Sequence, residues 1–146
     1  MPEFDRDIVL RLVSELRRSI ERLEHLSRLG EPDFLKDADK VGSAKYNFIV
    51  AIESCIDLCN HVISRNRLRA PEDYGDTFRV LAESNMLPAS FADELVAMAK
   101  FRNRLVHLYW EVGDRQMHEI LNSRLPDFTR FLTFLAEYLG WKDVPI

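Results

Sequence analysis

The longest helical pattern in the chain is centred on residues 46–63, which read YNFIVAIESCIDLCNHVI. Its apolar side chains recur every three or four residues, the spacing that aligns them along one face of an α-helix. They are Tyr46, Phe48, Ile49, Ile52, Cys55, Ile56, Cys59, Val62 and Ile63. The pattern predicts a long helix from about residue 37 to residue 68 with one buried stripe. Gly42 costs about 1 kcal/mol relative to alanine inside a helix, which favours a regular start after that position.

The same spacing recurs on both sides of this helix. In chain order it predicts helices at residues 5–29, 77–84, from 90 into the segment 100–109, and 114–138, with a connector at 31–36. The expected N-caps are Asp5 or Asp7, Asp76 and Ser90, because short polar side chains accept hydrogen bonds from a first helical turn. Pro126 lies inside the last pattern, where it should kink the helix or split it.

These patterns predict an all-α protein. No segment alternates strictly between apolar and polar residues, so no strand is expected. The 146 residues contain only five glycines and six prolines, and the 47% apolar and 30% charged residues are typical of a globular protein. We therefore expect an antiparallel bundle of four long helices plus one short helix, in one domain spanning residues 1–146.

Composition also limits the location and the partners. The formal net charge of −4 excludes a global basic field, so any RNA binding must come from a local patch. The N-terminus carries Glu3, Asp5 and Asp7 and lacks a long apolar run, and no stretch of about 18 apolar residues exists. No signal peptide and no membrane contact are expected, and the predicted location is the cytoplasm. We expect Cys55 and Cys59 to be small buried hydrophobic residues rather than metal ligands or partners in a disulfide.

One polar group, Arg102, Asn103 and His107, has residue types suited to RNA cleavage. Attack of a ribose 2′-hydroxyl on the neighbouring phosphate needs a base, stabilisation of the phosphate charge and a proton for the leaving oxygen. Histidine can take or give a proton near neutrality, and arginine binds phosphate oxygens through two donors. Asn103 could orient the phosphate or the imidazole, and no metal or cofactor is required. Alone, such a pair more often makes a surface salt bridge and a core histidine.

The spacing of this pair sets a geometric condition. Five steps along a continuous helix separate Arg102 and His107 by about 140° around its axis. They would not share a face, so either the helix loosens before His107 or each side chain meets groups from elsewhere.

A second polar row, Glu53, Asp57 and His61, recurs every four residues on one face of the central helix. Two acids and one histidine make an incomplete site for a divalent metal. We therefore prefer a supporting role, in which the acids hold Arg102 or contact another subunit.

The chain resembles the HEPN superfamily, in particular its HepT-like toxin branch. The match includes residues 101–109, an arginine and a polar residue followed by His107, with Tyr109 two positions further on. It continues through residues 51–63, 74–83 and 87–88, in the right order and spacing, so the resemblance covers nearly the whole chain.

The resemblance implies a metal-independent endoribonuclease toxin that forms a homodimer. In this branch the arginine and histidine of both chains meet in a cleft at the interface, which makes Arg102 and His107 the expected catalytic residues and Asn103 a supporting one. The implied partner is a minimal nucleotidyltransferase antitoxin that transfers adenylyl groups to the tyrosine at the position of Tyr109. A phosphate there would repel RNA.

Two other functions remain open at this stage. The chain could be a non-catalytic HEPN module that binds nucleotides or pairs with a nucleotidyltransferase, which the acidic net charge mildly favours. Alternatively, Glu53, Asp57 and His61 could support a metal-dependent enzyme, the option ranked last.

Overall fold

The computed structural model describes residues 1–143, and within them the chain forms seven α-helices and one short 3-10 turn. The elements are α1 (Arg6–Ser27), α2 (Glu31–Leu35), α3 (Ala38–Arg65), α4 (Tyr74–Glu83), α5 (Ala89–His107), η1 (Tyr109–Glu111), α6 (Asp114–Ser123) and α7 (Leu125–Leu139). The all-α prediction is confirmed. The number of helices is larger than the four long and one short that the sequence predicts.

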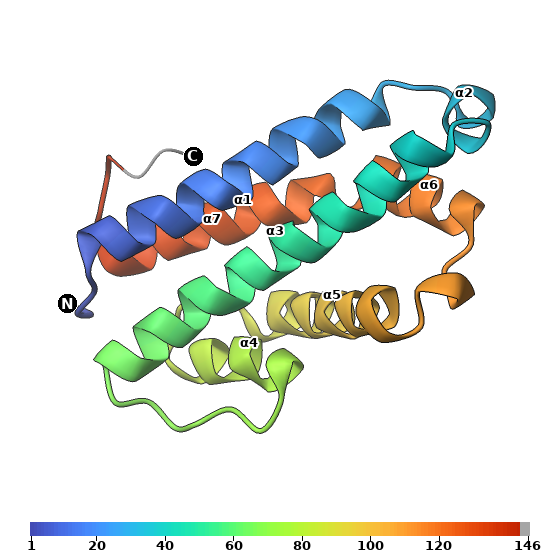
Figure 1. The fold of residues 1–146 in the computed structure, drawn as a ribbon. Helices are drawn as coiled ribbons and strands as arrows, with labels where there is room; N and C mark the ends of the chain where they lie inside the picture. The colour runs from blue at the N-terminus through green and yellow to red at the C-terminus, as the bar shows by residue number, and fades with distance from the viewer. Residues whose placement is uncertain (144–146) are drawn as a thin grey trace.

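The long helices α1 and α3 form the centre of the bundle (Figure 1). The chain reverses direction at α2, so that α1 and α3 pack against each other along most of their lengths. On one side α7 packs against α1, and on the other α4 and α5 form a helical pair below α3. This arrangement brings the end of α5 and the start of α4 close to the middle of α3.

One continuous core joins these helices. Six phenylalanines are almost completely buried, namely Phe34, Phe48, Phe78, Phe91, Phe128 and Phe131. The Phe48 ring of α3 lies 6.2 Å from both the Phe101 ring of α5 and the Phe128 ring of α7, measured between centroids. Each fully buried side chain of this size contributes about 1.5–3 kcal/mol to the burial free energy. The packing of α5 onto α3 is therefore set by core contacts.

The two cysteines belong to this core. Cys55 and Cys59 are free thiols with almost no exposure. Burial raises the pKa of both thiols, as expected when a charged form loses its hydration. The prediction that they are small buried hydrophobes is confirmed.

The N-caps show where local patterns mislead. Asp5 caps α1 as predicted, by accepting from the N–H groups of Asp7 and Ile8. The expected cap of α4, Asp76, was wrong, because Asp73 takes that role and accepts the N–H of Asp76 at 2.7 Å.

The expected cap of α5 was also wrong. The helix begins at Ala89, two residues earlier than the Ser90 cap requires, and Pro88 occupies the cap position without a side-chain hydrogen bond. The Pro88 carbonyl accepts the N–H of Ala92 at 2.9 Å, so the backbone itself closes the first turn.

One connection differs from the prediction, and another agrees with it. The expected connector at residues 31–36 contains the helix α2, whose Phe34 is fully buried and draws the segment onto the core. The last helix is split at Arg124, with Pro126 in the first turn of α7, where a missing N–H does no harm.

Gly42 lies inside α3, which begins at Ala38 rather than after the glycine. A Cβ atom at position 42 would lie 4.0 Å from the Tyr109 hydroxyl, so a longer side chain there would meet the tyrosine. The glycine thus leaves room for η1 against α3.

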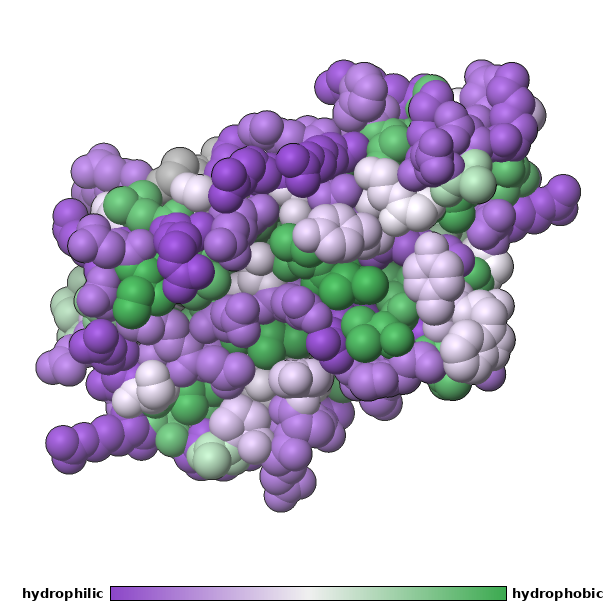
Figure 2. All heavy atoms as spheres, viewed as in Figure 1, coloured by the Kyte–Doolittle hydropathy of each residue, from purple (hydrophilic) through white to green (hydrophobic). Residues whose placement is uncertain are grey.

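The surface in the orientation of Figure 1 is mostly hydrophilic, with hydrophobic residues gathered where α3 passes α5 (Figure 2). Large apolar side chains exposed near the end of α5 are Val106, Leu108, Tyr109 and Trp110. Among residues 1–143, no helix has both the length and the apolar character needed to cross a bilayer.

Candidate active site at the end of helix α5

Arg102 is held in place by α3. Its Nε and Nη2 atoms donate to the same carboxylate oxygen, Oε1 of Glu53, at 3.0 and 2.6 Å. Its Nη1 atom donates to Oδ1 of Asn103 at 3.0 Å. Three of the five guanidinium N–H groups are thereby engaged, and the side chain is only 12% exposed. Arg102 is a fixed positive charge close beneath the surface.

This contact also orients the amide of Asn103. Arginine has donors and no acceptor, so the amide must turn its oxygen toward Arg102. Within residues 1–143, the Nδ2 group of Asn103 has no hydrogen-bond partner, and it remains available as a donor.

His107 is the last residue of α5 and is exposed. It follows Asn103 by four residues, so the two side chains lie on the same helical face. Both line a surface hollow of about 490 Å³. The other lining residues are Asn60 of α3, Pro71 and Asp73 of the α3–α4 connection, and Tyr74 and Thr77 of α4.

Arg102 does not line this hollow itself, but it contacts two residues that do, Asn103 and Tyr74. Its guanidinium carbon lies 4.9 Å from the centroid of the Tyr74 ring, a cation–π distance. Helix α5 stays regular to its end, because the N–H of Leu108 still bonds to the Arg104 carbonyl at 2.8 Å. The helix therefore does not loosen before His107, and Arg102 and His107 meet different surroundings.

Tyr109 begins η1 and lies against α3 with 45% of its surface exposed. The Nζ atom of Lys45 lies 4.1 Å from the centroid of its ring and donates to the Val112 carbonyl at 3.0 Å. The Lys45 side chain is only 6% exposed. Lys45 is not among the predicted site residues, although its place beside the apolar stripe of the central helix is visible in the sequence.

The polar row on α3 does not form one site. Glu53 binds Arg102, whereas Nε2 of His61 accepts the backbone N–H of Asp5 at 2.9 Å, at the start of α1. Burial and the charge of Arg65 lower the pKa of His61. Neutral imidazole is the form that accepts this bond.

Asp57, between them, is exposed. Partial burial of its carboxyl group, followed by repulsion from Glu53, raises the pKa of Asp57. Within residues 1–143, no three histidine, cysteine, aspartate or glutamate residues are grouped to hold a metal ion.

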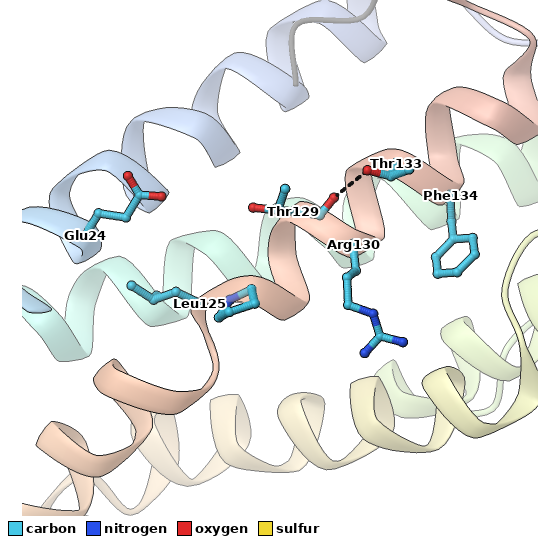
Figure 3. Close-up of a pocket in the computed structure, with 7 residues that line it drawn as sticks. Glu24, Leu125, Thr129, Arg130, Thr133 and Phe134 are labelled. Carbon is cyan, nitrogen blue, oxygen red and sulfur yellow. Dashed lines mark hydrogen bonds between the residues drawn. The ribbon is translucent and has the colours of Figure 1, made fainter.

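A second hollow lies between α1 and α7 and contains none of the predicted site residues (Figure 3). It measures about 510 Å³ and includes Glu24, Leu125 and Phe134. Its arginine, Arg130, points toward α5 and binds Glu94 at 3.4 Å. With no histidine on its walls, this hollow is a weaker candidate for proton transfer than the one at His107.

Comparisons with known proteins agree with the all-helical fold and show the family. A family described as "Ribonuclease HepT-like" matches residues 16–135, which include Glu53, Arg102, His107 and Tyr109. The mRNA nuclease HepT of Shewanella oneidensis is 29% identical over 126 residues, covering 86% of this chain and 94% of that protein.

Two solved structures share the architecture. One is the tri-AMPylated Shewanella oneidensis HEPN toxin in complex with an MNT antitoxin. It has a TM-score of 0.83 and 26% identity, over 91% of this chain and 99% of that one. The other is the cytosolic protein YutE of Bacillus subtilis, with a TM-score of 0.82 over 100% of this chain and 98% of that one. At 17% identity, YutE supports the fold alone.

Proposed function

Because this chain belongs to the ribonuclease HepT-like family, we propose that it is a metal-independent endoribonuclease that acts as the toxin of a toxin–antitoxin pair. The observation that carries the proposal is the hollow at the end of α5. There His107 and Asn103 share one face, and Arg102 is held beside them by Glu53.

In the proposed reaction, His107 accepts the proton of a ribose 2′-hydroxyl. The 2′-oxygen forms a bond to the adjacent phosphorus, the bond from phosphorus to the 5′-oxygen breaks, and an imidazolium gives that oxygen a proton. The Nδ2 group of Asn103 donates to a phosphate oxygen, and the charge of Arg102 stabilises the phosphorane. No cofactor takes part.

We propose that a homodimer completes the site. One copy offers a single exposed imidazole at the hollow, whereas the reaction uses one group as base and another as acid. The exposed apolar residues Val106, Leu108 and Trp110 lie within three positions of His107 in the sequence and are suited to burial against a second copy.

We propose that a nucleotidyltransferase antitoxin switches the site off at Tyr109. The tyrosine oxygen attacks the α-phosphorus of ATP, its proton passes to a base, and pyrophosphate leaves. The related Shewanella oneidensis toxin is tri-AMPylated in complex with its MNT antitoxin. Tyr109 is half exposed at the end of the helix that carries His107, so an attached phosphate would repel RNA nearby.

The test is cleavage of single-stranded RNA in EDTA. We expect the wild type to cleave and His107→Ala to lose at least about 100-fold in rate, since general acid–base catalysis contributes on the order of 10²–10⁴.

Incubation with the nucleotidyltransferase and ATP should add adenylyl groups, detected by mass, and stop cleavage. Tyr109→Phe should cleave and resist this treatment.

Three outcomes would contradict the proposal. Equal cleavage by wild type and His107→Ala would place catalysis elsewhere, and activity lost in EDTA would indicate a metal enzyme. A wild type that cleaves no RNA but binds the nucleotidyltransferase would instead indicate a non-catalytic interaction module.

A further inference from the structure

The hollow at His107 has walls that the proposed reaction does not use. Asn103 and His107 form one side, whereas Asn60, Asp73 and Tyr74 form the rest together with Pro71 and Thr77. These side chains come from α3, from the α3–α4 connection and from α4. They combine one aromatic ring with amide and carboxylate groups, which is the chemistry that recognises a nucleobase by its face and its edge.

The side chain of Arg102 supports one face of the Tyr74 ring. It is 47% exposed at the first position of α4, and the guanidinium carbon of Arg102 lies 4.9 Å from its centroid. Arg102 is itself fixed by Glu53, so the ring rests on a rigid group. An exposed aromatic ring of this kind offers its remaining surface for stacking.

The backbone beneath Tyr74 is fixed by an ion-pair network. Arg69 donates to Asp76 at 2.6 and 3.0 Å and to Glu83 at 2.8 and 3.1 Å. Asp76 also accepts the N–H of Glu72 at 2.9 Å. The connection that carries Asp73 and Tyr74 is thereby tied to both ends of α4, so the stacking surface needs little ordering when a ligand arrives.

The polar wall offers hydrogen bonds to a base edge. Asp73 uses Oδ1 to cap α4, which leaves its other carboxylate oxygen as an acceptor. The Asn60 side chain makes no hydrogen bond within the described part of the chain and offers both a donor and an acceptor. A carboxylate accepts from the exocyclic amino groups of adenine, cytosine or guanine, which uracil lacks.

We propose that this hollow binds one unpaired nucleobase of the RNA substrate, next to the phosphate that His107 acts on. The base stacks on Tyr74 and presents its amino edge to Asp73 and Asn60. The inference rests on the proposed ribonuclease function and adds its substrate specificity. A volume of about 490 Å³ is within the range of small-ligand sites.

The experiment measures binding and cleavage of short single-stranded RNAs that contain one 2-aminopurine, whose fluorescence falls on stacking. Tyr74→Leu keeps the bulk and removes the aromatic face, Tyr74→Phe restores the face, and Tyr46→Leu alters an exposed tyrosine on α3 that does not line the hollow. We expect Tyr74→Leu to raise Kd and KM about tenfold, with a smaller change in kcat and no quenching. Tyr74→Phe and Tyr46→Leu should match the wild type.

A second variant tests the hydrogen bonds to the edge of the base and keeps the ring of Tyr74. Asp73→Asn keeps an oxygen to cap α4 and replaces a carboxylate oxygen by an amide group, so the preference for amino-bearing bases over uracil should weaken several-fold. The inference is overturned if Tyr74→Leu binds, quenches and cleaves as the wild type does. It is also overturned if Tyr74→Phe is as defective as Tyr74→Leu.

Failure of the ribonuclease proposal gives a different result. If the wild type cleaves no RNA, the 2-aminopurine RNA can still be bound to the His107→Ala protein. The quenching of its fluorescence then reports whether a base stacks on Tyr74. Retained quenching then supports the base site, and absent quenching overturns it.

Discussion

Polar side chains recur every four residues both at the end of α5 and in the polar row of α3, but they gather around one hollow only at the end of α5. Asn103 and His107 lie four residues apart and line one hollow. On α3, Glu53 and His61 are separated by two such steps, and they bind groups on different elements, Arg102 of α5 and the backbone before α1.

The difference has a simple geometric cause. A helix rises 1.5 Å per residue, so one four-residue step covers about 6 Å and two steps cover about 12 Å. A single small ligand can touch two side chains about 6 Å apart, whereas groups at the ends of a 12 Å row meet different neighbours. Periodicity therefore predicts a shared face, and only the packing partners decide whether that face is a site.

Among the changes that test this comparison, we expect the greatest effect from a substitution at Asn103 of the α5 group. Asn103→Asp keeps the oxygen that Arg102 binds and replaces the Nδ2 donor by an oxygen that repels phosphate. We expect RNA cleavage to fall about 10- to 100-fold, because loss of one transition-state donor is costly. Thermal unfolding should change little.

The matched control is the reverse change on α3. Asp57→Asn removes a carboxylate from the row, and cleavage should stay within about twofold of the wild type, since surface substitutions are usually mild. Equal activity of Asn103→Asp and Asp57→Asn would remove the distinction between the two regions.

A smaller effect concerns the contact between Glu53 and Arg102, which joins the two regions. Glu53→Gln leaves the largely buried Arg102 with a neutral partner. We expect the free energy of unfolding to fall by about 1–2 kcal/mol, less than for a fully buried pair because the Glu53 side chain is 42% exposed.

Urea unfolding at pH 7 measures this change, and a pair on α1 provides the control. Arg11 and Glu15 lie 3.5 Å apart, and the Arg11 side chain is 63% exposed, unlike that of Arg102, so Glu15→Gln should cost less than about 0.5 kcal/mol. A Glu53→Gln protein as stable as the wild type would show that Arg102 needs no charged partner.

The smallest effect is a pH dependence at the far end of the α3 row. The pKa of His61 is lowered in the folded protein, so the unfolded chain takes up the proton first as the pH falls. The stability that neutral His61 contributes is present above its unfolded pKa of about 6.5 and is lost as the pH falls below it. His61→Gln should flatten this slope between about pH 7 and pH 5, by less than about 1 kcal/mol.

The measurement is urea unfolding of wild type and His61→Gln across that pH range. The hydrogen bond from the Asp5 N–H to Nε2 predicts the sign. A wild type that gains stability relative to the variant as the pH falls would contradict it.

Much of the fold could be predicted because helices are encoded locally. Most of the apolar stripe of residues 46–63 became the buried face of α3, although Tyr46 in that stripe is 61% exposed, and Asp5 caps α1 as expected. The prediction failed where two local signals competed. Asp73 and Asp76 are both suitable caps for α4, and Arg69, seven residues before Asp76 in sequence, engages Asp76 and leaves the cap to Asp73.

The candidate site likewise has one part that local spacing predicts and another part that it does not. Spacing along the chain is enough to place Asn103 and His107 on one helical face and Arg102 off it, since helix geometry depends on spacing alone. Tertiary packing, by contrast, sets that Glu53 holds Arg102, that Tyr74 joins the hollow and that His61 binds the backbone of Asp5 before α1. These contacts join elements distant along the chain, and core packing rather than any local pattern sets which of them meet.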